Sequence, residues 1–514
     1  METSRTEYST RNTTVAVVSR MTAILMGFVT RVVFTHTLSE SYVGVNGLFT
    51  DILNVLSLTE LGVGTAITYA LYRPVAQKDI KKQQQLMLLY RNFYRGTALC
   101  VLLVGLTIVP FLDVLMKNRP QVEHLTLIYL LYLANSVLSY LLVYKRTLIE
   151  AHQKNYIVLV YQTTLLVLQD VLQMIILVTT HNFLLFLVMY LVCTVLSNFF
   201  ISQRADQLYP YLKQPCREKI DRKEKQEIFR NIRAMMMHKL GNVVVNNTDN
   251  LLISAFVGVI SVGIYSNYYL LIGSVRQVLD QIFQGITASV GNLGVTEEKK
   301  KIQDIFETAF FIGQWLYGFA AICLYELLNP FVALAFGKKY LFPENIVLIL
   351  CINFFMTGTR KAALTFRDSM GLFWFDRYKA LVEAGLNLVF SILLVRQFGT
   401  LGVFIGTFLS GLLTSVWVEP YVLYREKLKA KLSPFFLRYL GYTAVVAVTW
   451  VLIDLLCRLY TGSLFWQLVI RLGICIFLIN GLWILCYHRT NAWKKVVVRL
   501  HNICKKYKNT GKKK

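Results

Sequence analysis

The sequence predicts an all-α polytopic membrane protein, and three observations lead to this fold class. The chain of 514 residues is 55% hydrophobic, and only 16% of its residues are charged. Its mean hydropathy is +0.50. Apolar runs long enough to cross a bilayer alternate with short charged blocks along the chain. Soluble proteins carry about 25% charged residues, so this composition indicates a protein with most of its surface in lipid.

The positions of the apolar runs predict about fourteen membrane-spanning helices. Each run is roughly 20 residues long, which matches the hydrocarbon thickness of a bilayer. Six runs precede a long basic linker, six follow it, and two close the chain. They lie at approximately 13–36, 43–71, 96–115, 125–144, 156–178, 183–203, 234–260, 262–293, 305–336, 345–366, 379–397, 401–424, 439–459 and 464–488.

The basic residues between these runs predict the orientation of the chain. On one side the loops are rich in lysine and arginine, at 73–95, 145–154, 213–233, 299–301, 377–379 and 425–431, and so is the tail. On the other side most loops are short and nearly uncharged, with basic exceptions at Lys117, Arg119, Lys338, Lys339, Arg396 and Arg458. The positive-inside rule therefore places both termini in the cytoplasm of a multi-pass cell-membrane protein.

The formal net charge of +25 does not indicate a nucleic-acid-binding protein, because the basic residues are divided among these short blocks. Such blocks suit loops that face an anionic leaflet, so we expect anionic membrane lipids, and no nucleic acid, among the partners. The nine cysteines lie mostly within apolar runs and show no zinc or redox spacing. We therefore expect no metal site and no cofactor.

A weak internal repeat divides the spans into two halves. Shifting the first two spans by about 219 positions aligns Val43-Gly44-Val45 with Val262-Gly263-Ile264, and Arg20 with Lys239. Internal symmetry of this kind is common in transporters. We therefore predict an amino-terminal six-helix lobe, a basic cytoplasmic linker, a pseudo-symmetric carboxy-terminal six-helix lobe, and two additional helices with a basic cytoplasmic tail, at 1–202, 203–233, 234–424 and 425–514.

Polar residues inside the seventh span form the first candidate site. On a helix, they fall on one arc of roughly 120°; the residues are His238, Lys239, Asn242, Asn246, Asp249 and Asn250. A lysine at the centre of a bilayer costs roughly 3 kcal/mol, so this face should line a wet cavity or meet polar partners. Asparagine amides both donate and accept hydrogen bonds, which suits sugar hydroxyls.

Two arginines in the first span form the second candidate site. Arg20 and Arg31 are eleven residues apart, which puts them on nearly the same face of a helix, about 16 Å apart along its axis. With Lys239, they would turn cations from both halves toward a central interface. The alternative is that Arg20 and Arg31 extend to opposite membrane surfaces.

Acidic and aromatic residues complete the set of candidates. Asp51, Glu60 and Asp249 lie in predicted spans and are candidates for ion coupling or charge balance. Arg276 and Asp280 have i,i+4 spacing, which predicts an ion pair within one helix. Several aromatic residues could form platforms for sugar rings, although aromatics in spans are more often core or interface anchors; these are Tyr265, Tyr268, Tyr269, Trp315 and Tyr317.

Several stretches of the chain resemble the bacterial polysaccharide flippases. They are VGVNGLFTDILNVLSLTELGVGTAITYALYRPVA from Val43, HKLGNVVVNNTDNLLISAFVGVISVGIYSNY from His238, FRDSMGLFWFDRYKALVEAGLNLVFSILL from Phe366, GVFIGTFLS from Gly402 and WVEPYVLY from Trp417. These flippases belong to the superfamily of multidrug and toxin exporters and lipid II flippases.

The resemblance implies a transporter with two six-helix lobes around a central cavity and two further helices. It implies an undecaprenyl-diphosphate-linked oligosaccharide as substrate, a repeat unit of a capsule or exopolysaccharide, moved from the inner to the outer leaflet. Polysaccharide polymerase and other assembly proteins would be its partners. Basic residues would bind the pyrophosphate, and Arg20, Arg31 and Lys239 remain candidates for that role on their spacing alone.

Three alternatives follow from the sequence. A cation-coupled drug or small-solute exporter of the same superfamily would depend on a carboxylate such as Asp51 or Asp249. A membrane glycan polymerase or ligase would need a large external loop or a catalytic motif, and the sequence contains neither. A scaffold without transport activity would not need polar stripes inside its spans. We therefore expect a transporter and not an enzyme.

Overall fold

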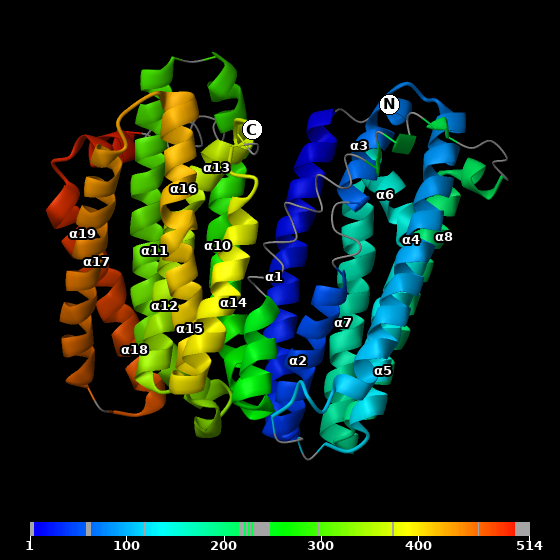
Figure 1. Ribbon diagram of the computed structural model, residues 1–514, viewed down its shortest axis with the longest axis horizontal. Coiled ribbons are helices and arrows are strands. Elements are labelled where there is room, and N and C mark those ends of the chain that lie inside the picture. The colour runs from blue at the N-terminus through cyan, green and yellow to red at the C-terminus, as the bar shows by residue number, and fades with distance from the viewer. Residues whose placement is uncertain are drawn as a thin grey trace, which may run out of the picture. The chain divides into compact units, whose positions relative to one another are not determined.

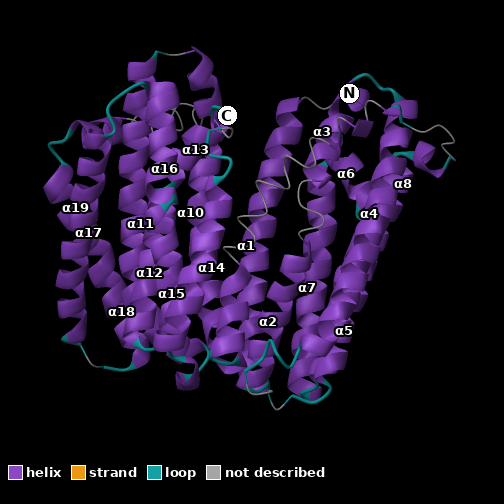
Figure 2. Ribbon diagram, viewed as in Figure 1, coloured by secondary structure: helices purple, strands orange, loops and turns teal. Residues whose placement is uncertain are grey.

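The structure is a computed structural model. It describes residues 5–57, 63–117, 120, 122–214, 220–222, 225–226, 228–229, 247–296, 298–372, 375–460 and 462–498. Over these residues the chain forms helices and no strand (Figure 2), which confirms the all-α class. Contacts divide the chain into two compact units, Met1–Ser266 and Asn267–Lys514. The predicted boundaries of the lobes and the linker remain a prediction.

The first unit contains the helices from α1 to α8 (Figure 1), the helical residues 247–256 and the first part of α10. Its helices are α1 Arg5–Thr37, α2 Glu40–Leu56, α3 Val63–Ala76, α4 Ile80–Ile108, α5 Leu125–Leu141, α6 Tyr144–Ala151, α7 Asn155–Thr180 and α8 Phe183–Leu208. Helix α7 packs along both α1 and α8, and α5 packs along α4 and α8.

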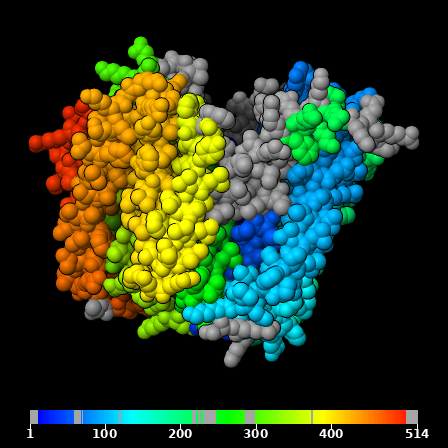
Figure 3. All heavy atoms as spheres, viewed as in Figure 1, coloured from blue at the N-terminus to red at the C-terminus, as the bar shows by residue number. Residues whose placement is uncertain are grey.

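The second unit contains most of α10 and the helices that follow it. They are α10 Val259–Thr296, α11 Lys299–Ala335, α12 Glu344–Thr359, α13 Lys361–Ser369, α14 Lys379–Phe398, α15 Thr400–Leu413, α16 Ser415–Val422, α17 Ser433–Arg458, α18 Leu464–Ile474 and α19 Asn480–Tyr487. Two π-helical turns, Leu423–Leu428 and Cys475–Ile479, continue α16 and join α18 to α19. The face of this unit seen in Figure 3 is formed by its yellow and orange segments, α14 to α17.

The helices have the length and composition of membrane spans. Among the described residues, ten helices are long and apolar enough to cross a membrane, and the bent pair α5–α6 would be an eleventh. Helix α17 exposes large apolar side chains, including Leu437 at 72% and Leu440 at 63%. Apolar surface of this extent is stable in lipid and not in water. The protein is therefore a multi-pass membrane protein, and the count of fourteen spans remains a prediction.

Small and polar residues bring the helices of the second unit together. A Cβ atom on Gly406 of α15 would lie 2.6 Å from the backbone nitrogen of Ser391 in α14, so only glycine permits this approach. Asn353 of α12 donates to the carbonyl of Phe404 at 2.9 Å. Because lipid and apolar side chains are equally apolar, close packing and hydrogen bonds of this kind hold membrane helices together.

The aligned positions of the internal repeat meet within the first unit. A Cβ atom on Gly44 of α2 would lie 2.0 Å from the carbonyl oxygen of Val259, and one on Gly263 would lie 3.1 Å from the carbonyl oxygen of Glu40. A shift of 219 positions relates position 44 to 263 and position 40 to 259. The contact of Gly44 with the Val259 carbonyl is therefore equivalent to the contact of Gly263 with the Glu40 carbonyl. Equivalent residues of a two-fold repeat meet in this reciprocal way at the symmetry axis.

Candidate functional site

In the first unit, a carboxylate and an amide from distant parts of the chain form a polar contact. Asn250 donates from Nδ2 to Oδ2 of Asp51 in α2, at 2.6 Å. Asn54, one turn further along α2, has its amide nitrogen 3.5 Å from the other carboxylate oxygen. Asp249 and Asn250 are buried, with 7% and 9% of their surface exposed. Two of the predicted site residues, Asp51 and Asn250, are therefore in direct contact.

One polar atom of the Asn250 side chain has no hydrogen-bond partner among the described residues. The side-chain oxygen Oδ1 is buried and accepts no hydrogen bond from any residue that the structure describes. Leaving a buried acceptor unpaired costs about 1–3 kcal/mol, so such atoms in native proteins need an explanation. A donor from outside the described chain, such as a hydroxyl group, would satisfy it.

Arg31 and Arg20 both provide positive charge to the first unit, but only Arg31 is half-buried. Arg31 of α1 is half-buried, and its guanidinium carbon is 5.9 Å from the ring centre of Phe34. Its charge also acts on the hydroxyl of Tyr132, which donates to the side chain of Asn46 in α2. Arg20 is exposed. Arg31 therefore belongs to a polar cluster with residues of α2 and α5.

In the second unit, a buried network of charges surrounds the break between α12 and α13. Arg360, at this break, donates two hydrogen bonds to Glu419 of α16, from Nη2 at 2.6 Å and from Nε at 3.1 Å. Lys379 of α14 also pairs with Glu419, and Glu383 lies 3.5 Å from Arg360 Nη1. Glu419 is fully buried and the other three side chains are 10–12% exposed. Two positive and two negative charges balance, which makes this burial possible.

The residue after Arg360 makes a second, partly buried pair on the other side of the break. Lys361 Nζ lies 2.7 Å from Oδ2 of Asp280 in α10, and Tyr317 of α11 donates to Oδ1 at 2.6 Å. Arg276 instead lies over the ring of Phe354, 6.0 Å from its centre. The predicted pairing of Asp280 with Arg276 is therefore wrong, because Asp280 faces α13 and α11.

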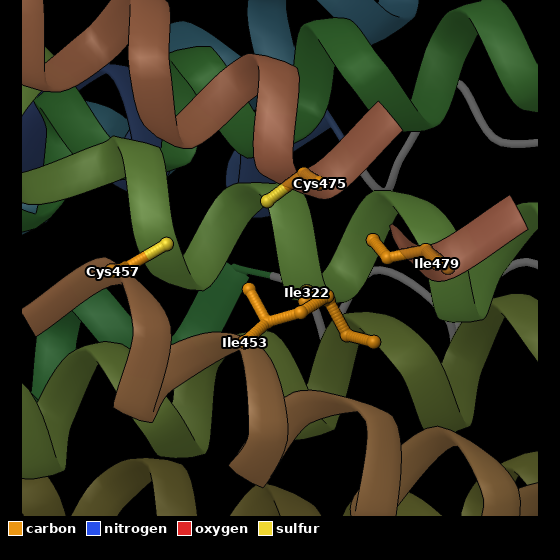
Figure 4. Close-up of a cluster of buried hydrophobic side chains, with 5 residues drawn as sticks. All are labelled: Ile322, Ile453, Cys457, Cys475 and Ile479. Atoms are coloured by element: carbon orange, nitrogen blue, oxygen red, sulfur yellow. The ribbon is translucent and has the colours of Figure 1, made fainter. Parts of the chain in front are cut away.

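A third charge pair attaches α18 to the rest of the second unit. Arg471 Nη1 lies 3.6 Å from Oε2 of Glu326 in α11 and donates to the Glu326 carbonyl at 3.2 Å. Beside it, side chains of α11, α17 and the π-helical turn Cys475–Ile479 form an apolar cluster (Figure 4); its members are Ile322, Ile453, Cys457, Cys475 and Ile479. The two additional helices thus share a core with α11.

The sequence match identifies the family. The family model described as "Polysaccharide biosynthesis protein" matches residues 9–286, which is more than half of the chain. The chain belongs to this polysaccharide biosynthesis protein family. The match includes α2, the helical residues 247–256 and most of α10, and therefore the Asp51–Asn250 contact. No curated protein matches the sequence significantly.

The fold of this family member is similar to that of solved transporters. The lipid II flippase MurJ, in an inward closed conformation, superimposes with a TM-score of 0.65 at 13% identity, over 93% of this chain and 98% of that one. An inward-facing multidrug resistance MATE family transporter of the MOP superfamily gives 0.61 at 14% identity, over 80% and 99%. A mutant of the Vibrio cholerae MATE transporter VcmN gives 0.54 at 15% identity, over 82% and 99%. The protein therefore has the fold of this superfamily.

The structure places only some of the residues that the sequence singled out. His238, Lys239, Asn242, Asn246 and Glu60 lie outside the described residues. The aromatic candidates belong mostly to the interior: Tyr268 and Tyr317 are fully buried, and Trp315 donates to Asn480 at 3.0 Å. These rings pack within the unit, in agreement with the alternative reading of aromatics as core residues.

The charge network of the family member was missed by reasoning from the sequence. Arg360, Lys361 and Glu419 all lie inside predicted spans, and their opposite charges in separate spans were a signal that they pair. Glu419 stands in WVEPYVLY, and Lys379 follows FRDSMGLFWFDRY, two stretches that carry the resemblance. Which cation meets which acid depends on how the helices pack, and spacing along one helix does not contain that information.

Proposed function

We propose that the protein is a flippase that moves an undecaprenyl-diphosphate-linked oligosaccharide from the inner to the outer leaflet of the cell membrane by alternating access. Its product would supply the synthesis of a surface polysaccharide such as a capsule or exopolysaccharide. The observation that carries this proposal is the family match over residues 9–286 together with the MurJ-like fold over 93% of the chain. That flippase acts on lipid II, which is itself a lipid-linked substrate.

The polar residues of the first unit are chemically suited to such a substrate. A pyrophosphate carries about two negative charges, and a cation at about 4 Å contributes on the order of 4 kcal/mol before desolvation at an effective dielectric constant of about 20. We assign this contact to Arg20, Arg31 and Lys239. The unpaired Oδ1 of Asn250 supports a contact with a sugar hydroxyl, since it needs a donor. We expect Asn242 and Asn246 to act in the same way.

We assign the coupling of transport to a carboxylate of the same region. Asp51 is hydrogen-bonded to Asn250, and Asp249 and Glu60 are the other candidates. A protonated carboxyl and a carboxylate make different hydrogen bonds, so proton binding at Asp51 would change the contact between α2 and residue 250. A cation-coupled exporter of small solutes would also use such a carboxylate, and it would not need the cations.

The test separates these two functions. Arg31→Ala and Arg20→Ala should each reduce polysaccharide export and cause the undecaprenyl-linked intermediate to accumulate on the cytoplasmic leaflet, with the amount of protein in the membrane unchanged. Arg458→Ala is the matched control, because its side chain is 55% exposed at the end of α17. Normal export in Arg20→Ala, Arg31→Ala and Lys239→Ala would reject the assignment of the cations. Export of a drug without any effect on polysaccharide would favour the small-solute exporter.

A further inference from the structure

An aromatic cavity lies at one end of the second unit. It has a volume of about 500 Å³, and its walls include Glu307, Phe310, Tyr424, Phe435, Arg438 and Tyr487. Four spans begin or end beside it: α11 begins at Lys299, α17 begins at Ser433, the span containing α16 ends at Leu428, and the last span ends at Tyr487. A cavity at the ends of four spans lies at the level of lipid headgroups.

The cavity walls present aromatic rings from four different segments. The ring centres of Phe310 and Phe435 are 4.7 Å apart, those of Tyr424 and Phe435 are 5.7 Å apart, and those of Tyr442 and Tyr487 are 5.3 Å apart. The faces of such rings attract organic ammonium groups, which is how many proteins bind amine-bearing ligands.

One ion pair supplies both signs of charge to the same cavity. Arg438 of α17 pairs with Oε2 of Glu307 in α11, and their side chains are 36% and 26% exposed. Arg438 also donates from Nε to the carbonyl of Pro434 at 3.1 Å, and Glu307 Oε1 accepts from Gln303 at 2.9 Å. A ligand that carries a positive and a negative group a few atoms apart would complement this pair, whereas a simple anion would face the carboxylate.

A buried hydroxyl group provides an independent indication of a ligand. The side chain of Tyr424 is 1% exposed, and its hydroxyl has no hydrogen-bond partner among the residues that the structure describes. Tyr424 also lines the cavity. Buried hydroxyls in native proteins are almost always paired, so a phosphate oxygen in the cavity would explain this one.

We propose that the cavity binds the headgroup of a zwitterionic phospholipid with a primary ammonium group, namely phosphatidylethanolamine. The ammonium lies against Glu307 and the ring faces, and the phosphate lies against Arg438 and accepts a hydrogen bond from Tyr424. Phosphatidylglycerol has no cation for Glu307, and the trimethylammonium of phosphatidylcholine cannot donate a hydrogen bond to it. This site is separate from the substrate residues of the first unit.

Lipid titration of the full-length protein in detergent, followed by native mass spectrometry, tests the proposal. Phosphatidylethanolamine should bind about tenfold more tightly than phosphatidylglycerol or phosphatidylcholine with the same acyl chains, because those lipids lose a charge-assisted hydrogen bond. Glu307→Gln and Arg438→Gln should each remove this preference. Asp304→Asn is the matched control: it breaks the exposed pair with Lys495, 3.0 Å apart, one turn earlier on α11.

Equal binding of the three lipids by the wild-type protein, or an unchanged preference in both variants, would overturn the proposal. Tight binding of free phosphoethanolamine would also overturn it, because the ligand would then be soluble.

Tyr424→Phe separates lipid binding from folding. The buried hydroxyl has no partner in the described protein, so its removal should leave the unfolding temperature of the lipid-free protein unchanged or raise it. The affinity for phosphatidylethanolamine should fall about tenfold, since a hydrogen bond to a charged group is lost. An unchanged affinity, or a loss of stability without lipid, would contradict the role assigned to this hydroxyl.

Discussion

Asp51 depends on a donor that comes from a distant part of the chain. Its Oδ2 atom accepts a hydrogen bond from Asn250 at 2.6 Å. Within α2, Asn54 also donates to the carboxylate, but over a longer distance of 3.5 Å to Oδ1. A carboxylate removed from water needs such hydrogen bonds, because burial without them is costly. The contact therefore links the charge state of one residue to the packing of two segments.

Two substitutions separate the structural role of this contact from its use in transport. Asn250→Leu removes the donor from Asp51 and should lower the free energy of unfolding by about 1.5–3 kcal/mol. Asp51→Asn retains the shape of the side chain, and its amide oxygen can still accept a hydrogen bond from Asn250. The variant protein should therefore reach the membrane in normal amounts, but it should not support export. Asn54→Leu is the control and should have little effect on either quantity.

Unfolding in detergent and polysaccharide export in cells are the two measurements. Export at the wild-type level in Asp51→Asn would show that the carboxylate is not required for coupling.

The buried network at Arg360 gives a second prediction at this scale. Glu419→Gln leaves Arg360 and Lys379 with only Glu383 to balance them, and should lower the free energy of unfolding by about 3–5 kcal/mol. The double variant Glu419→Gln/Arg360→Gln balances the charges again and should recover part of this loss. The control, Arg458→Gln, removes a highly exposed pair and should barely change the unfolding temperature.

Equal unfolding temperatures for Glu419→Gln and Arg458→Gln would mean that the network does not stabilise the fold.

The sequence predicted individual polar residues better than it predicted their partners. Asp51, Asp249 and Asn250 could be selected because each is a polar residue in an apolar run; the structure brings Asp51 and Asn250 into contact and buries Asp249. The pairing of Asp280 with Arg276 failed for a physical reason: i,i+4 spacing permits a pair, but the side chain pairs with whichever cation is closest after the helices pack. In the structure that cation is Lys361.

At the scale of helices, the apolar runs predicted the positions of the helices well, but they did not predict where one span is divided into two helices. The run 156–178 corresponds to α7 Asn155–Thr180, and 379–397 corresponds to α14 Lys379–Phe398. The run 345–366 contains two helices, α12 and α13, which meet at Arg360. Hydropathy does not detect this break, because it measures how apolar a segment is and not where the helical hydrogen bonds are interrupted.

The reciprocal glycine contact gives a prediction for the element scale. Gly44→Ala would place a methyl group 2.0 Å from the Val259 carbonyl oxygen, and Gly263→Ala would place one 2.9 Å from the Gly44 nitrogen. Backbone atoms cannot move aside as a flexible side chain can, so each substitution should destabilise the protein by about 3 kcal/mol or more. Thermal unfolding in detergent measures this loss.

Gly273→Ala is the control, because it lies in the same helix, α10, with no atom within 4 Å of the added methyl group. It should be neutral or slightly stabilising, since alanine favours a helix over glycine. Similar unfolding temperatures for Gly263→Ala and Gly273→Ala would contradict the close approach of α2 and α10.

At the scale of the whole molecule, charge and hydropathy predict different properties. The composition predicts a multi-pass helical protein, and the ten apolar helices of the described chain agree with it. The repeat predicts an equivalence between Gly44 and Gly263, and their contact has the reciprocal form that a two-fold relation produces. Orientation in the membrane follows neither from hydropathy nor from the repeat, because lipid is apolar on both sides of its midplane. It depends on the basic residues of the loops.

The orientation can therefore be tested by itself. We predict that Thr180→Cys, at the exposed end of α7, reacts with a membrane-impermeant maleimide in intact cells. Arg425→Cys, whose native side chain is 65% exposed among the basic residues 425–431, should react only after the membrane is permeabilised. Both variants need a background in which all nine native cysteines are replaced, because any remaining thiol could also react. The opposite labelling pattern would place the basic loops outside, and the proposed inner-to-outer direction of transport would then lose its basis.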